Sequence, residues 1–340
     1  MARRYLPPPT RRHPLRTPAA LAGIAVVAVF VIVWWVSDAD EAGPESEIIA
    51  DTPMAQADDT PAPPAAPAKT DAPVERGAKP KPPEEAPPPP NPERVKTAVE
   101  AGQKALAKDD VLTARVQMSA ALRAGAAGEQ ATELRAKLVQ LANHAVFSPA
   151  RVSGDPHTAT YVVKKGDTLR KIAKQYKITP ELIARVNSLA NMSMIREGAR
   201  LKIVNGPFGA VVHKGEHVMD IFLDDVLVRT YKVGLGEHDS TPTGTWKVKN
   251  KLTNPTYFPP RGGKIVQADD PNNPLGEHWL GLEGIAGEAK SQLRYGIHGT
   301  NEPDSIGKNL SLGCIRLHNQ DVNELYTLLV IGHSQVAVKP

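Results

Sequence analysis

Proline is distributed very unevenly along this chain. Most of its 32 prolines lie in the first hundred residues, in runs such as "PAPPAAPAK" and "EEAPPPPNP". Proline lacks a backbone N–H donor, and a segment with so few bulky apolar residues cannot bury enough surface to offset the entropy of ordering. We therefore predict an extended, disordered linker over residues 37–92, with a reach on the order of 100–150 Å. The folded domains must follow it.

The chain begins with a basic segment and then an uncharged one. Residues 1–18 carry five arginines and no acid, and Ala19 to Val36 carries no charge. A helix of that length just crosses a hydrocarbon layer of ~30 Å. Trp34 and Trp35 lie at its far end, where aromatic rings favour the membrane interface. We predict one transmembrane helix over 19–36, with the basic stub in the cytoplasm and the rest outside, and a cleaved signal peptide is the alternative.

Charge and cysteine content narrow the chemistry. The formal net charge is +4 and the pI is 9.0, with much of the excess in the first sixteen residues. No basic patch is interleaved with aromatic residues, so nucleic-acid binding is not indicated. The single cysteine, Cys314, excludes an internal disulfide and a multi-cysteine zinc cluster. We predict neither a metal nor another cofactor. The cysteine count alone favours a buried, unreactive thiol at Cys314.

Residues 93–147 show helical periodicity. Apolar residues recur at spacings of three and four, and Gly125 and Gly128 punctuate the last two helices. The string "ALAKDDVLTARVQMSAAL" resembles a tetratricopeptide-type hairpin. Only about one and a half repeats fit, whereas a free-standing array needs about three or more. We predict a helical spacer, and docking of an unidentified protein partner is the alternative.

Residues 159–205 form the next predicted unit. "YVVKK" is a predicted strand, "GDTL" a turn that starts a helix, and "GARLKIV" a closing strand. A second helix begins at "ITPEL", with Thr179 as its N-cap and Pro180 at its first position. The order is strand, helix, helix, strand. From the residues alone, this is a small βααβ unit with a structural role as its simplest interpretation.

The same segment carries a resemblance. "YVVKKGDTLRKIAKQYKITPELIARVNSL…IREGARLKIV" resembles a LysM domain over its whole length. The resemblance implies binding of glycans that contain N-acetylglucosamine, such as peptidoglycan. It also implies a sugar groove formed by Gly166, Asp167, Thr168, Leu169 and Asn187.

Residues 207–340 are rich in short β-branched runs. The turn pairs Lys214–Gly215 and Asp224–Asp225 separate the first three runs, and Trp246 and Val248 alternate with lysines in a half-buried pattern. "HWLGL", "YGIHG", "GCIRL" and "QVAVK" are further predicted strands. No βαβ rhythm is present. We therefore predict a mostly antiparallel β sandwich or partly open barrel.

One histidine and the only cysteine follow one another in this β-rich region. His298 ends a predicted strand and Cys314 enters the next, after the polar loop "NEPDSIGKNLS". An imidazole beside a thiol takes its proton and later returns it to a leaving amine. Gly313 lets backbone amides point at a developing oxyanion. Arg316 lies two residues on and so on the same strand face as Cys314, where it can bind a substrate carboxylate.

The full string is more specific than this pair. "HGT…SLGCIRLHNQD", preceded by "TPTGTWKVKNK" and "NPLGEHWLGL", resembles the YkuD-type L,D-transpeptidase domain over nearly its whole length. The resemblance implies a β-rich fold that attacks a peptidoglycan tetrapeptide between the L-centre of its third residue and the terminal D-alanine. The acyl group then passes to an amine of another stem, giving a 3–3 cross-link, or to water.

The resemblance also implies roles for individual residues. Cys314 is the implied nucleophile and His298 the general base, with the backbone of Gly299 orienting its ring. The amides of Gly313 and Cys314 form the implied oxyanion hole. The implied substrate-binding residues are Arg316, Ser311 and Asn319.

Other residues near this string receive structural interpretations. Thr241–Gly244 is predicted to form a turn near the cleft. Asn319 is the predicted N-cap of the helix "NQDVNELYTLL". His318 is expected to be structural. Leu312 stands where some members of the family carry a second histidine, and another branch lacks that histidine too.

The order of parts predicts a protein of the bacterial cytoplasmic membrane, single-pass, with soluble domains in the periplasm or cell wall. Its predicted partners are peptidoglycan stem peptides and glycan strands. Two functions compete with transpeptidation. One is an L,D-carboxypeptidase that uses water as acceptor, and the other is a wall-binding scaffold without catalytic activity.

Overall fold

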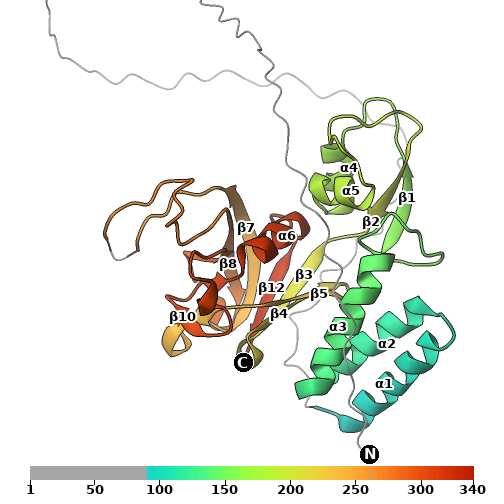
Figure 1. The fold of residues 1–340 in the computed structure, drawn as a ribbon, viewed down its shortest axis with the longest axis horizontal. Coiled ribbons are helices and arrows are strands. Elements are labelled where there is room, and N and C mark those ends of the chain that lie inside the picture. Colours follow the sequence, from blue (N-terminus) through green and yellow to red (C-terminus); the bar gives the residue numbers. More distant parts are fainter. Residues whose placement is uncertain (1–89, 261) are drawn as a thin grey trace, which may run out of the picture. The chain divides into compact units, whose positions relative to one another are not determined.

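The computed structural model describes residues 90–260 and 262–340 (Figure 1). The predicted basic stub, the predicted transmembrane segment and nearly all of the predicted linker lie outside these residues. Within them, no helix is both long enough and apolar enough to cross a membrane.

The first described region is helical, as predicted. Its helices are α1 (Pro92–Leu106), α2 (Val111–Arg123) and α3 (Gly128–Ala145). The Asn91 side chain accepts a hydrogen bond from the amide of Arg94 and caps α1, and Asp110 caps α2 through the amide of Thr113. Gly125 has a positive φ in the turn between α2 and α3, where a Cβ would crowd Pro90.

The second region has the predicted order of strand, helix, helix, strand. Its elements are β1 (Thr158–Val162), α4 (Leu169–Tyr176), α5 (Pro180–Val186) and β2 (Arg200–Val204). β1 and β2 pair antiparallel, with Tyr161 opposite Leu201. Thr179 caps α5 through the amide of Leu182 and Pro180 is its first residue, so both of these predictions are confirmed.

The third region contains the large β-sheet. Its strands are β3 (Phe208–His213), β4 (Val218–Leu223), β5 (Val226–Lys232), β7 (Gly244–Thr253), β8 (His278–Ala286), β9 (Tyr295–His298), β11 (Ile315–Arg316) and β12 (Gln335–Lys339). Their order across the sheet is β11-β9-β8-β7-β12-β3-β4-β5. The pairs β9–β11 and β3–β12 are parallel and the others antiparallel. A mostly antiparallel β domain is confirmed. It is a curled sheet with β11 and β5 as its ends.

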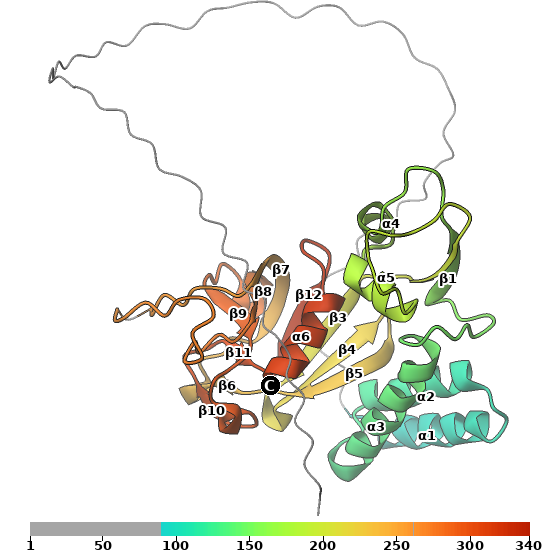
Figure 2. The same ribbon diagram turned by 45° about the horizontal axis from the view of Figure 1, so that its top comes forward.

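Smaller elements complete this region. A second, parallel pair joins β6 (Leu235–Gly236) to β10 (Asn309–Ser311). Short 3₁₀ turns span η1 (Lys214–Glu216), η2 (Glu237–Asp239), η3 (Gly287–Ala289) and η4 (Pro303–Ser305). One helix, α6 (Asn319–Leu328), contacts β8 and β9 and buries Val322, Leu325 and Leu328 (Figures 1 and 2).

The start of α6 corrects one prediction. Asn319 is its first helical residue, and the N-cap position is His318, which makes no side-chain cap. The Asn319 side chain instead accepts a hydrogen bond from the amide of Thr300 at 2.8 Å. A nearby strand end competes for this side chain, and the prediction of an N-cap at Asn319 was wrong for that reason.

The helical region covers the end strand of the sheet. The Ser119 hydroxyl of α2 accepts a hydrogen bond from the Leu227 amide of β5 at 3.1 Å, and the Arg135 guanidinium of α3 pairs with buried Asp220 of β4 at 3.0 Å. Leu227 is buried among Met118, Leu138 and their neighbours. An uncovered end strand is a template for unwanted pairing, and these helices remove that edge.

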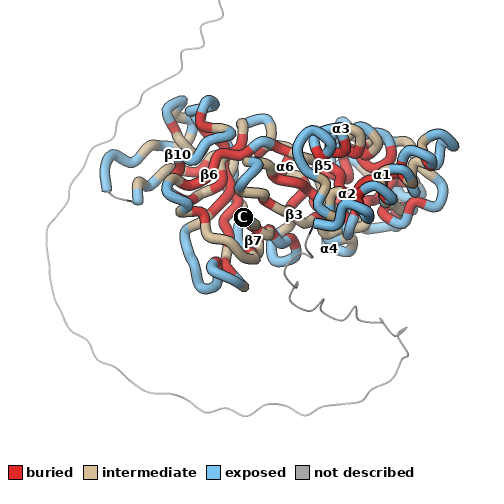
Figure 3. Tube along the Cα trace, turned by 90° about the horizontal axis from the view of Figure 1, so that it is seen from below, coloured by how far each residue is buried: buried red, intermediate tan, exposed pale blue. Residues whose placement is uncertain are grey.

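Burial follows the predicted alternation. Trp246 and Val248 of β7 are buried at 1% and 0% exposure, while Lys249 of the same strand is exposed. Figure 3 shows buried residues running along the strands and exposed residues on the outer helix surfaces and loops. The sheet therefore provides a rigid support for whatever lies at its β9–β11 end.

Candidate active site

The predicted nucleophile and base belong to neighbouring segments at one end of the sheet. β9 and β11 lie side by side in parallel, with His298 opposite Arg316 (Figure 2). Cys314 lies two positions before Arg316. Cys314 itself lies just before β11, and no hydrogen bond within residues 90–260 and 262–340 joins its thiol to the His298 ring. Strand alternation predicts that the two side chains share a face.

His298 is held as a neutral ring. It is 5% exposed, and its Nδ1 lies 2.6 Å from the carbonyl oxygen of Gly299. A carbonyl only accepts, so Nδ1 carries the proton and Nε2 keeps its lone pair. Burial lowers the pKa of His298 to about 4, although the carbonyls of Gly299 and Pro274 favour the protonated ring; the charge of Arg316 adds to the lowering. The ring is therefore in the form that a general base needs.

The His298 ring also has an aromatic support. It stacks on Trp279 of β8 with 5.7 Å between ring centroids and 18° between planes. Trp279 is the register partner of His298 in the β8–β9 ladder. The neighbouring strand therefore supports the plane of the His298 ring.

Cys314 is half-buried at the entry of β11. Its thiol donates to the carbonyl oxygen of Arg294 at 3.9 Å. Burial raises the pKa of the Cys314 thiol, and a backbone hydrogen bond from Gly296 and the charge of Arg316 act against this rise. At neutral pH the resting pair is thus a thiol and a neutral imidazole.

The backbone before Cys314 is tightly fixed. The Gly313 amide donates to Ser311 Oγ at 3.1 Å, and Ser311 Oγ donates to the Cys314 carbonyl at 2.6 Å. The buried Thr241 hydroxyl donates to the Gly313 carbonyl at 2.9 Å. Gly313 has φ +125°, and a Cβ there would lie 2.7 Å from the Tyr295 ring, so only glycine fits. Oxyanion binding by the Gly313 amide stays a prediction, since that amide already has an acceptor.

Arg316 has a partner that sequence reasoning missed. Its Nη1 lies 2.9 Å from Oε2 of Glu302, in the loop after His298. The Arg316 side chain is 16% exposed and that of Glu302 65% exposed. The buried Nε of Arg316 has no hydrogen-bond partner in the described part of the chain. The guanidinium is thus held from one side by the Glu302 carboxylate.

Ser311 and Asn319 contact the protein backbone. Ser311 braces the Cys314 loop, and Asn319 holds the amide of Thr300, two residues after His298. A Cβ on Gly299 would lie 2.1 Å from Asn319 Oδ1, so this close approach requires glycine. Substrate binding by Ser311 and Asn319 stays a prediction. No local signal in the sequence indicated the contacts of Thr241 and Glu302.

Three of the five predicted glycan-binding residues, Gly166, Asp167 and Thr168, form a turn before α4, and Leu169 is the first residue of that helix. Asp167 accepts hydrogen bonds from the Tyr161 hydroxyl and the Lys164 amide, both at 2.8 Å. Thr168 caps α4, and Leu169 is buried. Gly166 has φ +79° with no atom within 4 Å of an added Cβ. Their role in sugar binding stays a prediction.

The fifth residue, Asn187, is used inside the fold. Its Nδ2 donates to the carbonyls of Ile183 and Lys202, both at 2.8 Å, and its Oδ1 accepts from the Lys202 amide at 2.7 Å. No hydrogen bond in residues 90–260 and 262–340 joins it to the Gly166–Leu169 turn. The side chain therefore ties α5 to β2.

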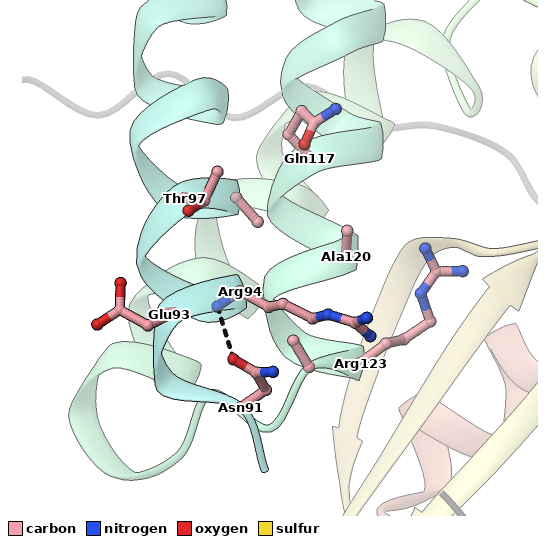
Figure 4. A pocket seen from close by; sticks show the side chains of 9 residues that line it. Asn91, Glu93, Arg94, Thr97, Gln117, Ala120 and Arg123 are labelled. Atoms are coloured by element: carbon pink, nitrogen blue, oxygen red, sulfur yellow. Dashed lines mark hydrogen bonds between the residues drawn. The ribbon is translucent and has the colours of Figure 1, made fainter. Parts of the chain in front are cut away.

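A separate groove of about 580 Å³ lies between α1 and α2. Figure 4 shows Arg94 reaching from α1 toward α2, Arg123 extending from α2 away from α1, and the Asn91 side chain engaged in capping α1. None of the predicted site residues lines it.

Comparison with known proteins identifies two domains. A sequence model of the L,D-transpeptidase catalytic domain (YkuD) matches residues 207–338, and one of the LysM domain matches residues 161–204. These matches cover the Cys314 site and the Gly166–Leu169 turn respectively.

Two relatives are similar over nearly their whole length. The putative L,D-transpeptidase YkuD of Bacillus licheniformis is 33% identical over 188 residues, which is 53% of this chain and 98% of that protein. The putative L,D-transpeptidase YkuD of Bacillus subtilis is 34% identical over 180 residues, which is 51% of this chain and 94% of that protein. Among solved structures, an L,D-transpeptidase from Mycobacterium tuberculosis has a TM-score of 0.31 at 12% identity, covering 54% of this chain and 90% of that chain.

Proposed function

The chain belongs to the L,D-transpeptidase family and carries a LysM domain, and from this premise we propose that it is a peptidoglycan L,D-transpeptidase that makes 3–3 cross-links. Cys314 attacks the carbonyl of the third residue of a tetrapeptide stem, and its proton passes to Nε2 of His298. D-alanine leaves with that proton as the thioester forms. An amine of another stem then attacks the thioester and releases Cys314.

One arrangement carries this proposal. A half-buried thiol lies just before β11 and a neutral imidazole ends the adjacent strand β9, with the Nδ1 proton of the imidazole fixed on the Gly299 carbonyl. A base with a fixed tautomer can accept a proton only at Nε2. Arg316, paired on one side only, supports binding of a stem-peptide carboxylate.

The remaining parts receive roles that the sequence suggests. We propose that the LysM domain, over residues 159–205, binds glycan strands and raises the local concentration of stem peptides at the catalytic domain, residues 207–340. The helical region, residues 93–147, is proposed as a spacer. Its packing on β5 supports a spacer fixed to the catalytic sheet.

Membrane anchoring is proposed from the sequence alone. Residues 19–36 are assigned to a single-pass anchor in the bacterial cytoplasmic membrane, residues 1–18 to a cytoplasmic stub and residues 37–92 to a tether. Fractionation of cells that express the full chain, compared with a chain lacking residues 19–36, tests this. Recovery of both in the same soluble fraction contradicts the anchor.

The decisive experiment incubates the full chain with purified tetrapeptide muropeptides and measures D-alanine release. We expect release by the wild type and none by Cys314→Ala, with cross-linked dimers as products. Equal release by both proteins contradicts the mechanism. Free tripeptides without dimers would assign the L,D-carboxypeptidase activity instead.

A second measurement separates an enzyme from a wall-binding scaffold. A carbapenem-type β-lactam should acylate the full chain once, at Cys314, and mass spectrometry detects the adduct. Under the scaffold alternative the thiol stays unmodified while binding to peptidoglycan persists.

A further inference from the structure

A side chain far away in the sequence holds the peptide group in front of the nucleophile. Thr241 is 2% exposed and lies in the turn before β7. Its Oγ1 accepts a hydrogen bond from the Gly236 amide at 2.9 Å and lies 2.9 Å from the Gly313 carbonyl oxygen. Because an amide can only donate, the single hydroxyl proton of Thr241 is left for that carbonyl.

The peptide between Gly313 and Cys314 is thereby oriented. It is a trans peptide, and in a planar trans peptide the C=O and N–H bonds point in opposite directions. Holding the Gly313 carbonyl against Thr241 therefore turns the Cys314 N–H away from Thr241. Ser311 engages the two outer groups, the Gly313 amide and the Cys314 carbonyl.

One backbone group of this pair has no partner. Of the four amide and carbonyl groups of Gly313 and Cys314, three are hydrogen-bonded, and the Cys314 N–H has no acceptor in residues 90–260 and 262–340. Cys314 is half-buried, and its amide is the one donor of this pair that remains available to another acceptor. Directly beside a nucleophile, such a donor can stabilise a transient negative charge.

We propose that Thr241 is a positioning residue, whose hydroxyl holds the Gly313 carbonyl so that the Cys314 amide faces the oxyanion of the tetrahedral intermediate. This rests on the proposed function. As the S–C bond forms, the π-electron pair of the substrate carbonyl moves onto its oxygen, and the thiol proton passes to His298. The oriented amide donates to that oxygen. When the C=O bond reforms, the amine of D-alanine departs with the proton from His298.

The chain offers a matched control in the same turn. Thr243 is also hydroxyl-bearing, and its Oγ1 donates to Glu288 at 2.7 Å while its amide donates to the same oxygen. No hydrogen bond within residues 90–260 and 262–340 joins it to Gly313. Loss of the Thr243 hydroxyl therefore disturbs the turn without releasing the Gly313 carbonyl.

The test compares Thr241→Val, Thr241→Ser and Thr243→Val in the full chain. For Thr241→Val we expect kcat for D-alanine release to fall about a hundredfold, as for loss of an oriented oxyanion donor, with KM unchanged. Thr241→Ser restores most of the rate because it keeps the hydroxyl. Thr243→Val keeps kcat near wild type. Alkylation of Cys314 by iodoacetamide stays unchanged in all three, since alkylation forms no oxyanion.

Infrared spectroscopy gives a readout that does not depend on turnover. The thioester carbonyl of the adduct with a carbapenem-type β-lactam should absorb at higher wavenumber in Thr241→Val than in wild type, because it loses a hydrogen bond. If Thr241→Val does not fold, Thr241→Ala takes its place with the same expectations.

Two results overturn the inference while the proposed function stands. One is wild-type kcat in Thr241→Val. The other is a parallel loss of kcat, alkylation rate and thermal stability in both valine variants, which marks a purely structural turn. A wild-type chain that releases no D-alanine, or a Cys314→Ala variant that releases as much, overturns the proposed function itself.

Discussion

The LysM turn and the Cys314 loop are built from similar parts but treat their polar groups differently. Each contains a glycine with positive φ, Gly166 or Gly313, and a hydroxyl side chain that fixes the local backbone. In the LysM domain, the polar side chains of the predicted sugar site are bonded within the fold. In the loop before β11, the amide of Cys314 is left without an acceptor in the described part of the chain. An amide without an acceptor beside a nucleophile is stronger evidence for a catalytic site than a fully hydrogen-bonded turn is for a sugar-binding site.

The two glycines allow the largest test of this difference. A Cβ on Gly313 would meet the Tyr295 ring at 2.7 Å and the Ser240 carbonyl at 3.0 Å, whereas a Cβ on Gly166 meets nothing within 4 Å. We expect Gly313→Ala to slow acylation of Cys314 at least about a hundredfold, because the amide moves out of line. The measurement is the rate of β-lactam adduct formation.

Gly166→Ala is the matched change. It introduces a side chain at positive φ in open space, which costs about 1 kcal/mol of unfolding free energy, and it should leave the acylation rate unchanged. Comparable losses of acylation in the two variants would mean that the Cys314 loop has no special geometry.

The pH dependence of thiol reactivity is the next largest effect. Burial raises the pKa of Cys314 and lowers the pKa of His298 to about 4, so above about pH 4 the folded protein holds a neutral imidazole and, at neutral pH, a protonated thiol. Alkylation by iodoacetamide should then rise about tenfold per pH unit between pH 6 and 8, as thiolate accumulates. Because Cys314 is the only cysteine, the label reports on it alone.

Enzymatic turnover should follow a different curve. His298 stays unprotonated until the pH approaches about 4, so D-alanine release should lose its base only there. A plateau of alkylation from pH 6 to 8 would instead indicate a preformed thiolate–imidazolium pair and contradict the neutral resting state.

Asn187 tests the other half of the comparison. Asn187→Ala removes three hydrogen bonds to backbone groups, and it takes this partner from the amide and the carbonyl of Lys202, while the Ile183 carbonyl keeps the backbone amide of residue 187. The expected cost is about 2–3 kcal/mol of unfolding free energy. The same Lys202 whose backbone Asn187 holds also donates through its buried ammonium to the carbonyls of Ala145, Ser148 and Ala150 at and after the end of α3. Loss of Asn187 should therefore weaken this connection as well. Urea unfolding of the full chain measures the loss.

The control is Asn191→Ala, also in the LysM domain. Asn191 is exposed and accepts one hydrogen bond, from the Ser193 amide, so its loss should cost at most about 1 kcal/mol. Binding of soluble N-acetylglucosamine oligomers is measured alongside. If Asn187→Ala retains stability but no longer binds the oligomers, Asn187 belongs to the sugar groove and the comparison fails.

Local sequence patterns predicted the features that depend on residues close together in the sequence. The alternation at Trp246 and the cap at Thr179 depend on neighbours within a few residues, and both appear in the structure as predicted. The contact of Thr241 with Gly313 joins residues 72 positions apart, and nothing near Thr241 announces it. Asn319 shows the opposite failure. The local sequence predicted a helix cap at Asn319, but its side chain accepts from the Thr300 amide, which only the tertiary fold brings near.

The smallest expected effect concerns Glu302. In the structure Glu302 occupies one side of the Arg316 guanidinium, so a substrate carboxylate must displace it. The pair is more than half exposed on the Glu302 side, and exposed ion pairs contribute about 1 kcal/mol or less. Glu302→Gln should therefore lower KM for a tetrapeptide by about two- to fivefold at low salt, leave kcat unchanged, and show less benefit as ionic strength rises.

The matched control for this change is Glu288→Gln. Glu288 is exposed and bonds Thr243, away from Arg316, so its KM should equal that of the wild type. A rise of KM in Glu302→Gln would reverse the interpretation, because it would mean that Glu302 holds Arg316 in its binding position. In that case Arg316 resembles the LysM side chains, whose partners belong to the fold. The Cys314 amide would then be the remaining donor proposed to be available to the substrate.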